Sequence, residues 1–356
     1  MSGHGHILFC ADACSVHTQR WVGAMAERGW RCSVLSRHFQ RIAGADVHPL
    51  DTPDGNWPWF AAVPRVRRLA AELAPDIVHG HYVTSYGLWA AASGRRPLVL
   101  TGWGSDILVS PHRSRLVHAV TGWTLRRADL ITADSQDMLN AMARYRPRAP
   151  LHQIYWGADT EKFRPYPSTD PVFRIASLRA WEPNYNIDVI LDATARLRAA
   201  EPGAAIELHL LGGGPLEARL RSTAQALGLD DVVHFHGRVD EDRLAQLVNR
   251  SHVSVSIPDS DATSVALLES MASGLPVVVS DLPANRQWVD AQGGWLLAPR
   301  DPHALALALR ELLHDPARAL AMGRHNRARV DPHAARRTQM DRVDTLYRGL
   351  LDGGRR

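Results

Sequence analysis

The chain has 356 residues, of which 45% are hydrophobic, 22% charged and 7% aromatic. This composition excludes a disordered or fibrous protein, and the length allows two or three domains of roughly 100 to 200 residues each. No segment approaches the roughly 18 to 20 apolar residues of a membrane span, and the amino-terminal apolar stretch is too short for a secretory signal. We therefore expect a cytoplasmic protein, with a peripheral position at the inner membrane face as the alternative.

The net charge of +4 conceals a difference between the two halves of the chain. Residues 1–165 hold 19 basic and 13 acidic side chains, whereas residues 166–356 hold 22 basic and 24 acidic ones. A basic half suits an anionic partner or a membrane surface, but there is no basic run of the kind found in nucleic-acid-binding arms, so nucleic acid is not an expected partner. Lys162 is the single lysine, which leaves arginine as the expected cation of any site.

Short apolar runs alternate with segments of helical period along the first half of the chain. The expected strands are 6–10, 32–35, 76–79, 97–101 and 129–133, and the expected helices are 15–28, 65–73, 86–92 and 115–127. This β–α alternation indicates a parallel sheet that is covered on both faces.

The alternation stops at a stretch rich in proline, where we place a linker at residues 157–170. It restarts with expected strands at 172–177, 205–211, 232–236, 253–257 and 276–280 and expected helices at 187–200, 216–227, 241–249 and 264–273. The predicted fold class is α/β, with two Rossmann-like, doubly wound parallel-sheet domains. The expected boundaries are 1–160, 161–335 and a terminal helix at 336–356 that packs back on the first domain.

Ligands of doubly wound sheets bind at the carboxyl ends of the strands, so we expect the two domains to face each other across a cleft. The loop after the first expected strand, residues 11–15, contains no glycine. A dinucleotide fingerprint needs glycines at this point, which disfavours NAD or FAD.

Residues 257–281 carry the strongest chemical signal: a strand, an acidic loop, a helix that contains Glu269, and a Gly-Leu-Pro turn into the next strand. Backbone N–H groups at the start of that helix, on Thr263, Ser264 and Val265, would form an anion site. The alternative is that Asp261 or Thr263 merely caps the helix. Glu269 favours a binding role, because a carboxylate among apolar residues needs a partner such as a sugar hydroxyl.

Here the chain resembles a known family. Asp261 and Glu269 stand eight residues apart, as in the E-x7-E signature of retaining glycosyltransferases of the GT-B fold, family 4, and residues 268–278 (LESMASGLPVV) are similar to that family's L-E-A-M-A-x-G-x-P-V-V. Further resemblances follow in the family's order along the chain: Ser135 after Ala128-Asp129, residues 157–163 (GADTEKF), residues 212–215 (GGGP) and residues 236–237 (HG).

The resemblance implies a nucleotide-sugar donor, UDP-linked, in the second domain. It assigns the ribose hydroxyls to Glu269 and the transferred sugar to Asp261, where the family usually has the longer glutamate. Arg179 matches the arginine of the family's diphosphate motif R-x-x-x-x-K-G, but Asn184 or Tyr185 stands at the lysine position. The other expected donor-binding residues are Thr263, Ser264, Val265, Gly213 and Gly214.

The first domain would hold the acceptor. Residues 101–106 (TGWGSD) resemble the family's T-x-H-G-x-D, with Trp103 in place of the histidine. We expect Asp106 to take part in the chemistry, with a turn cap as the alternative. The expected acceptor-binding residues lie at the carboxyl ends of strands: His17, His81, Trp103 and Gly104.

These observations predict a retaining glycosyltransferase that moves a sugar from a UDP-sugar to an acceptor hydroxyl. Residues 259–261 also spell D-x-D, a metal motif of another transferase fold, but no further ligand is evident and the three cysteines have no zinc spacing. We therefore expect no metal ion and no cofactor. The alternatives are a nucleotide-sugar epimerase, a phosphorylase, or a noncatalytic nucleotide or polyanion binder. The acceptor, which could be a saccharide, a natural product or a lipid-linked molecule, stays open, as does the oligomeric state.

Overall fold

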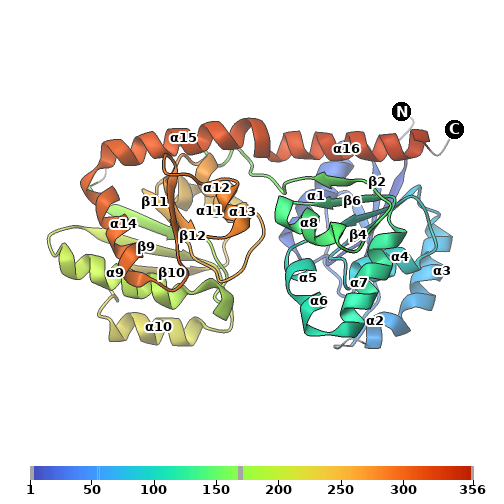
Figure 1. The fold of residues 1–356 in the computed structure, drawn as a ribbon, viewed down its shortest axis with the longest axis horizontal. Helices are drawn as coiled ribbons and strands as arrows, with labels where there is room; N and C mark the ends of the chain where they lie inside the picture. Colours follow the sequence, from blue (N-terminus) through green and yellow to red (C-terminus); the bar gives the residue numbers. More distant parts are fainter. Residues whose placement is uncertain (1–3, 54, 56, 167–170, 354–356) are drawn as a thin grey trace. The chain divides into compact units, whose positions relative to one another are not determined.

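The computed structural model describes residues 4–53, 55, 57–166 and 171–353. It divides into two compact units: the first unit contains residues 1–156 and 337–356, and the second unit contains residues 157–336. Figure 1 shows helices on both sides of a sheet in each unit. The predicted pair of α/β parallel-sheet domains is confirmed.

The first unit is built on a seven-stranded parallel sheet with strand order β3-β2-β1-β4-β5-β6-β7. Its strands are β1 (His6–Cys10), β2 (Arg31–Ser36), β3 (Ala45–Pro49), β4 (Ile77–His81), β5 (Leu98–Thr101), β6 (Leu130–Ala133) and β7 (Leu151–Gln153). The two edge strands, β3 and β7, were not among the predicted strands. Both are only partly buried, so they lack the apolar runs that identify central strands.

Helices cover this sheet on both faces. They are α1 (Val16–Glu27), α2 (Trp57–Ala61), α3 (Val63–Leu73), α4 (Tyr86–Ala92), α5 (Ser105–Leu108), α6 (Ser110–Arg113), α7 (Arg115–Arg127) and α8 (Gln136–Ala143). The terminal helix α16 (Arg336–Gly353) packs on the core of this unit through buried Tyr347, whose hydroxyl accepts a hydrogen bond from Trp21 Nε1 at 3.1 Å and lies 2.6 Å from His79 Nδ1.

The second unit has a six-stranded parallel sheet with order β10-β9-β8-β11-β12-β13. Its strands are β8 (Phe173–Ser177), β9 (Ile206–Leu211), β10 (Val233–Gly237), β11 (Val253–Ser256), β12 (Val277–Ser280) and β13 (Gly294–Leu297). Its helices are η1 (Pro183–Tyr185), α9 (Ile187–Ala200), α10 (Glu217–Ala226), α11 (Glu241–Asn249), α12 (Val265–Ala272), α13 (Pro283–Arg286), α14 (Pro302–His314) and α15 (Pro316–Ala334).

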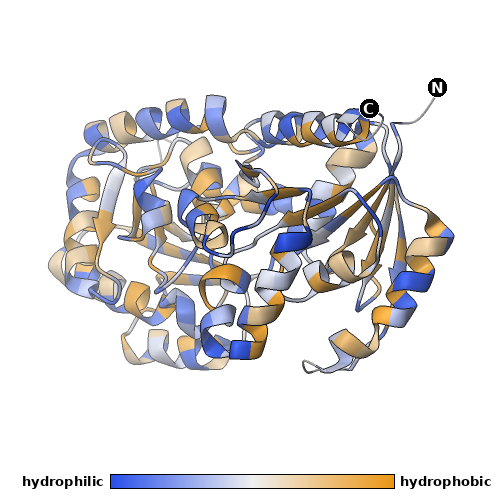
Figure 2. Cartoon of the chain, turned by 45° about the vertical axis from the view of Figure 1, so that its right-hand side comes forward, coloured by the Kyte–Doolittle hydropathy of each residue, from blue (hydrophilic) through white to orange (hydrophobic). Residues whose placement is uncertain are grey.

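The strands of both sheets are mostly hydrophobic, whereas the outer helices carry alternating hydrophilic and hydrophobic turns (Figure 2). The central strands β1, β4, β5, β6, β11 and β12 are buried along their whole length. Burial on both faces is the reason that β1 and β12 read as short apolar runs. Strands β4 and β11 also carry buried histidine and serine side chains. None of the helices within the described residues is long and apolar enough to span a bilayer.

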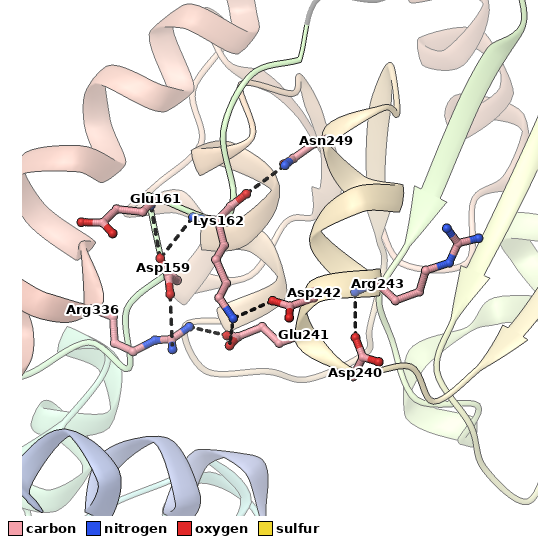
Figure 3. A network of polar contacts seen from close by, with 9 residues as sticks. All are labelled: Asp159, Glu161, Lys162, Asp240, Glu241, Asp242, Arg243, Asn249 and Arg336. Atoms are coloured by element: carbon pink, nitrogen blue, oxygen red, sulfur yellow. Dashed lines mark hydrogen bonds and ion pairs between the residues drawn. The ribbon is translucent and has the colours of Figure 1, made fainter. Parts of the chain in front are cut away.

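The two ends of the second unit are joined to each other and to α11 (Figure 3). Ala158 pairs with Ala335 as an isolated parallel bridge, and Arg336 Nη2 donates to Glu241 Oε1 at 2.6 Å. Lys162 Nζ lies 2.7 Å from Asp242 Oδ1 and 3.3 Å from Glu241 Oε2. The single lysine therefore pairs with helix α11 and does not replace the family's missing diphosphate lysine.

Candidate functional site

The structure brings two of the predicted site residues into direct contact. Arg179 follows β8 and Asp261 lies in the loop after β11; because β8 and β11 are neighbours, their carboxyl ends meet. Arg179 Nη2 donates to Asp261 Oδ2 at 2.7 Å, and Nη1 donates to the hydroxyl of Ser264. The guanidinium also lies over the ring of Tyr185, 4.3 Å from its centroid.

This ion pair is largely withdrawn from water. The Arg179 side chain is 9% exposed and that of Asp261 is 21% exposed. Burial raises the pKa of the Asp261 carboxyl, and the Arg179 guanidinium opposes that rise. Arg179 Nε is buried and has no hydrogen-bond partner among the described residues. A surface ion pair of Arg179 with the nearby Glu182 was the alternative to a phosphate-binding role, but the acidic partner of Arg179 is Asp261.

Helix α12 starts beside this pair. Its N-cap residue is Ser264, whose side chain accepts the bond from Arg179 and makes no capping bond of its own. Asp261 pairs with Arg179, so the alternative in which it merely caps the helix is wrong. The N-cap position lies one residue after Thr263. Thr263, Ser264 and Val265 are at most 9% exposed. Their binding of a donor phosphate through backbone N–H groups stays a prediction.

Glu269 lies in the second turn of α12 and is 3% exposed. The eight-residue spacing thus places one carboxylate on the loop before the helix and the other within the helix. Every residue of α12 except Ala266 is buried, so the helix is held by packing on both sides of Glu269. A buried carboxylate at this place suits contact with hydroxyl groups of a ligand.

The glycine turn after β9 supports the loop that carries Arg179. The N–H of Trp181 donates to Gly213 O at 3.1 Å. A Cβ at Gly212 would lie 2.1 Å from Arg179 O, and one at Gly214 would lie 2.4 Å from Trp181 O. Gly212, which was not among the predicted site residues, therefore permits backbone packing that positions Arg179. Donor contact by Gly213 and Gly214 stays a prediction.

Replacing Gly212 with alanine is expected to lower turnover by about 10²-fold, because a displacement of about 1 Å in a positioning element can cost that much. The new methyl group would push the Arg179 carbonyl, and with it the side chain that pairs with Asp261. Gly203→Ala is the matched control, since a Cβ there meets no atom within 4 Å. Steady-state kinetics with circular dichroism measure the effect; normal turnover of Gly212→Ala would exclude this positioning role.

In the first unit, three predicted acceptor residues come together at the carboxyl end of the sheet. The ring centroids of His17 and Trp103 are 5.9 Å apart, and those of His81 and Trp103 are 5.7 Å apart. Trp21 lies 5.3 Å from His81, and Trp156 lies 5.1 Å from His17. We call these five residues the aromatic cluster. Trp156 follows the short strand β7, and nothing in its local sequence marks it as a site residue.

The aromatic cluster contains polar atoms that lack partners. His81 is fully buried, and burial lowers the pKa of its imidazole to about 3. Neither ring nitrogen of His81 has a hydrogen-bond partner within the described part of the chain, and the same holds for Trp103 Nε1. Buried polar groups are nearly always paired in folded proteins, so this cluster is suited to a polar ligand.

Asp106 holds the loop that carries Trp103. Its Oδ1 accepts bonds from the N–H groups of Trp103 and Gly104 at 2.9 and 3.0 Å, and its Oδ2 accepts one from Val83 at 2.6 Å. The side chain is fully buried, and burial raises the pKa of its carboxyl to about 6. These contacts give Asp106 a positioning role, and its part in the chemistry stays a prediction. The Gly104 N–H is likewise engaged by Asp106, and its φ of +128° favours glycine.

Comparisons with known proteins agree with this geometry. The family described as glycosyl transferase 4-like matches residues 6–135, and the family described as glycosyl transferases group 1 matches residues 159–329. A D-rhamnosyltransferase of Pseudomonas aeruginosa is 27% identical over 88% of this chain and 76% of its own length. A GDP-mannose-dependent phosphatidylinositol monomannoside mannosyltransferase of Mycobacterium tuberculosis is 29% identical over 81% of this chain and 78% of its own.

Solved structures are similar over nearly the whole chain. Sucrose-phosphate synthase from Thermosynechococcus elongatus superposes with a TM-score of 0.82 at 18% identity, covering 98% of this chain and 99% of its own. Anabaena HepE, solved with UDP-glucose, gives a TM-score of 0.79 at 20% identity over 96% and 99%. Residues 6–135 thus belong to the glycosyl transferase 4-like family and residues 159–329 to the glycosyl transferases group 1 family. Since the two matches together span most of the sequence and the fold agrees, the chain is a glycosyltransferase with the GT-B fold.

Proposed function

We propose that this enzyme is a retaining glycosyltransferase that moves a sugar from a UDP-sugar to an acceptor hydroxyl. The observation that carries the proposal is the Arg179–Asp261 pair beside the start of α12, with Glu269 one turn further along. A relative is named as dependent on GDP-mannose and a structural neighbour was solved with UDP-glucose. Both names support a nucleoside diphosphate sugar as donor.

In this proposal the second unit binds the donor. As the bond from sugar to diphosphate breaks, negative charge grows on the leaving phosphate oxygens. The Arg179 guanidinium and the backbone N–H groups at the start of α12 would stabilise that charge. Glu269 would accept hydrogen bonds from the ribose hydroxyls, and Asp261 would contact the transferred sugar while it orients Arg179.

The aromatic cluster of the first unit would bind the acceptor. Tryptophan faces suit the apolar faces of a sugar ring. The nitrogens of His81 and Trp103, which lack a partner among the residues that the structure describes, suit its hydroxyls. With its pKa lowered to about 3, His81 is neutral at pH 7 and would hold a hydroxyl rather than a phosphate. This chemistry favours a saccharide or another hydroxyl-rich acceptor.

The test is release of nucleotide from a panel of donors, with UDP-glucose and GDP-mannose as the first pair. We expect release of UDP, faster in the presence of a saccharide acceptor, and a product of unchanged anomeric configuration. Release that requires added orthophosphate would instead indicate a phosphorylase, and isomerised donor without release would indicate an epimerase. Nucleotide binding without any turnover would leave the noncatalytic alternative.

Turnover is expected to continue in EDTA. Arginine and a helix N-terminus can neutralise a leaving diphosphate without a metal ion. The D-x-D sequence also supports this, since Asp259 pairs with Arg300 at 2.5 Å and Asp261 pairs with Arg179. The assay compares initial rates in EDTA, magnesium and manganese. Complete loss of turnover in EDTA, restored by either ion, would overturn this expectation.

The basic first unit is expected to bind anionic vesicles in a salt-dependent way. Trp57 on α2 is 77% exposed, and Arg68 is exposed on the adjacent helix α3. Trp57→Ala should weaken binding by about tenfold, which corresponds to about 1.4 kcal/mol. Leu320→Ala, an exposed apolar residue of the second unit, is the control. Vesicle sedimentation at low and high salt measures the binding of both variants. Equal binding at the two salt concentrations, and by the parent and Trp57→Ala, would exclude a role for this surface.

A further inference from the structure

One face of the β9–β10 pair carries a group of polar side chains. Glu207 and His209 are two residues apart on β9, and His234 and His236 are two residues apart on β10, with His234 directly opposite His209. Because side chains alternate along a strand, Glu207, His209 and His234 lie on the same face. The pairing register shifts between Phe235 and Gly237, but the ring of His236 still reaches His209 on that face. The opposite face of the same strands belongs to the hydrophobic core, which includes Leu208 and Leu210.

The side chains converge closely. His209 Nε2 lies 3.1 Å from Glu207 Oε2, and one ligand atom from each of Glu207, His209 and His234 lies within 4.8 Å of the other two. Within the described residues, no other group of His, Cys, Asp and Glu brings three ligand atoms this close. His209 is buried and Glu207 half-buried, whereas His234 is exposed, which leaves the group open to ions from solvent.

Two further residues orient this group. His209 Nδ1 lies 2.9 Å from His236 Nε2, and Arg174 Nε donates to Glu207 Oε2 at 2.9 Å. Histidines that bind metal ions characteristically use their other ring nitrogen in a hydrogen bond, which fixes the orientation of the ring. His236 would serve His209 in this way, and Arg174 would hold the carboxylate of Glu207.

We propose that Glu207, His209 and His234 bind a late first-row divalent cation such as Zn²⁺. Zinc bonds of about 2.0 to 2.2 Å put neighbouring ligand atoms about 3.4 Å apart, so the Glu207–His209 spacing already fits. The exposed ring of His234 stacks on that of His209 at a centroid distance of 5.0 Å and would turn toward the ion. Two imidazoles and one carboxylate favour Zn²⁺, Co²⁺ or Ni²⁺ over Mg²⁺ or Ca²⁺. A water molecule would complete a tetrahedral site.

The ion would join the edge strand β10 to β9. Edge strands have a partner on one side only, and an ion that binds only the folded protein raises its melting temperature. The three ligands belong to β9 and β10, whereas Asp261 and Glu269 belong to the loop after β11 and to α12. None of the three ligands is therefore a residue of the proposed donor site, and the test of the metal site does not depend on turnover.

The experiment titrates Zn²⁺ into the metal-stripped full-length protein by calorimetry, in a Cys14→Ser background because that cysteine is exposed. We expect one equivalent to bind, no heat of binding with Mg²⁺, and a higher melting temperature with Zn²⁺. Co²⁺ should produce the visible absorption bands of a four-coordinate site. His234→Ala should weaken Zn²⁺ binding at least tenfold, and His236→Phe should weaken it by about 10- to 100-fold.

His303→Ala is the matched control, because His303 is an exposed histidine of the same unit on α14. His234 is exposed, and its removal leaves the Arg174–Glu207 pair in place; circular dichroism checks that the variant is folded. Absence of Zn²⁺ binding by the parent would overturn the proposal. So would equal affinity in the parent and His234→Ala, or an equal loss in His303→Ala, which would mean nonspecific binding to surface histidines.

Discussion

Arg179→Ala should lower turnover by about 10²- to 10³-fold, the range observed when one charge-stabilising donor is removed from an active site. The missing lysine of the diphosphate motif is one reason to expect this large effect. The structure adds a second reason: Arg179 is buried, is oriented by Asp261, Ser264 and Tyr185, and keeps Nε without a partner among the described residues. A contact that strengthens as the leaving group gains charge lowers the barrier selectively. The turnover of Arg179→Lys should lie between those of the parent and Arg179→Ala, because an ammonium group cannot bind two oxygens in a fork.

Two controls separate catalysis from folding. Removing Arg179 leaves the Asp261 carboxylate partly buried without its cation, which destabilises a protein, so Arg179→Ala is compared with Arg179→Ala/Asp261→Asn. Arg198→Ala removes an arginine with an ion pair of the same length, 2.7 Å to Asp231, on the surface of the same unit. The turnover of each variant is compared with its melting temperature, which separates a catalytic loss from a loss of stability. Near-normal turnover of folded Arg179→Ala would show that the donor phosphates bind elsewhere.

Glu269→Ala should weaken binding of the free nucleotide by about 10- to 100-fold, the equivalent of about 1.5 to 3 kcal/mol for hydrogen bonds to a charged group. Ribose hydroxyls are held equally in the ground and transition states, so the loss should appear in KM with little change in kcat. Calorimetric titration of UDP and of GDP measures the affinity directly and also tests which base is preferred.

The matched control for Glu269 is Glu217→Ala on α10, an exposed glutamate of the same unit. Glu269→Gln keeps the size of the side chain and removes only its charge, so it should lose less affinity than the alanine variant. Circular dichroism is needed, because Glu269 is buried. Unchanged affinity of folded Glu269→Ala for both nucleotides would remove the ribose role.

The sequence predicted the central strands and the main helices because their signals are local. Runs such as β1 and β12 are buried on both faces and read as continuous apolar segments. The edge strand β3 is only partly buried and carries no such run. The edge strand β13 was also missed, although its sequence, Gly-Trp-Leu-Leu, is apolar. Helix α8 was also missed, although Ser135, which resembles a family position, is its N-cap and accepts from Met138 N–H.

Within the candidate site, sequence determined which residue types stand at the carboxyl ends of the strands, and tertiary structure decided their partners. The resemblance identified Arg179, Asp261 and Glu269, but pairing of the first two follows from the adjacency of β8 and β11. Asp106 matched a catalytic pattern, yet three backbone N–H groups occupy its carboxylate.

The same division applies to the aromatic cluster and to the proposed metal site. Trp156 reaches His17 only because β7 completes the sheet, and Glu207 and His209 meet His234 only because β10 pairs with β9 in one register. Hydrophobic periodicity is a property of neighbouring residues, so the sequence by itself determined the two α/β units and their order of elements. The partner of a charged or aromatic side chain depends on strand order and register, which connect residues far apart in the chain, and only the tertiary structure decided it.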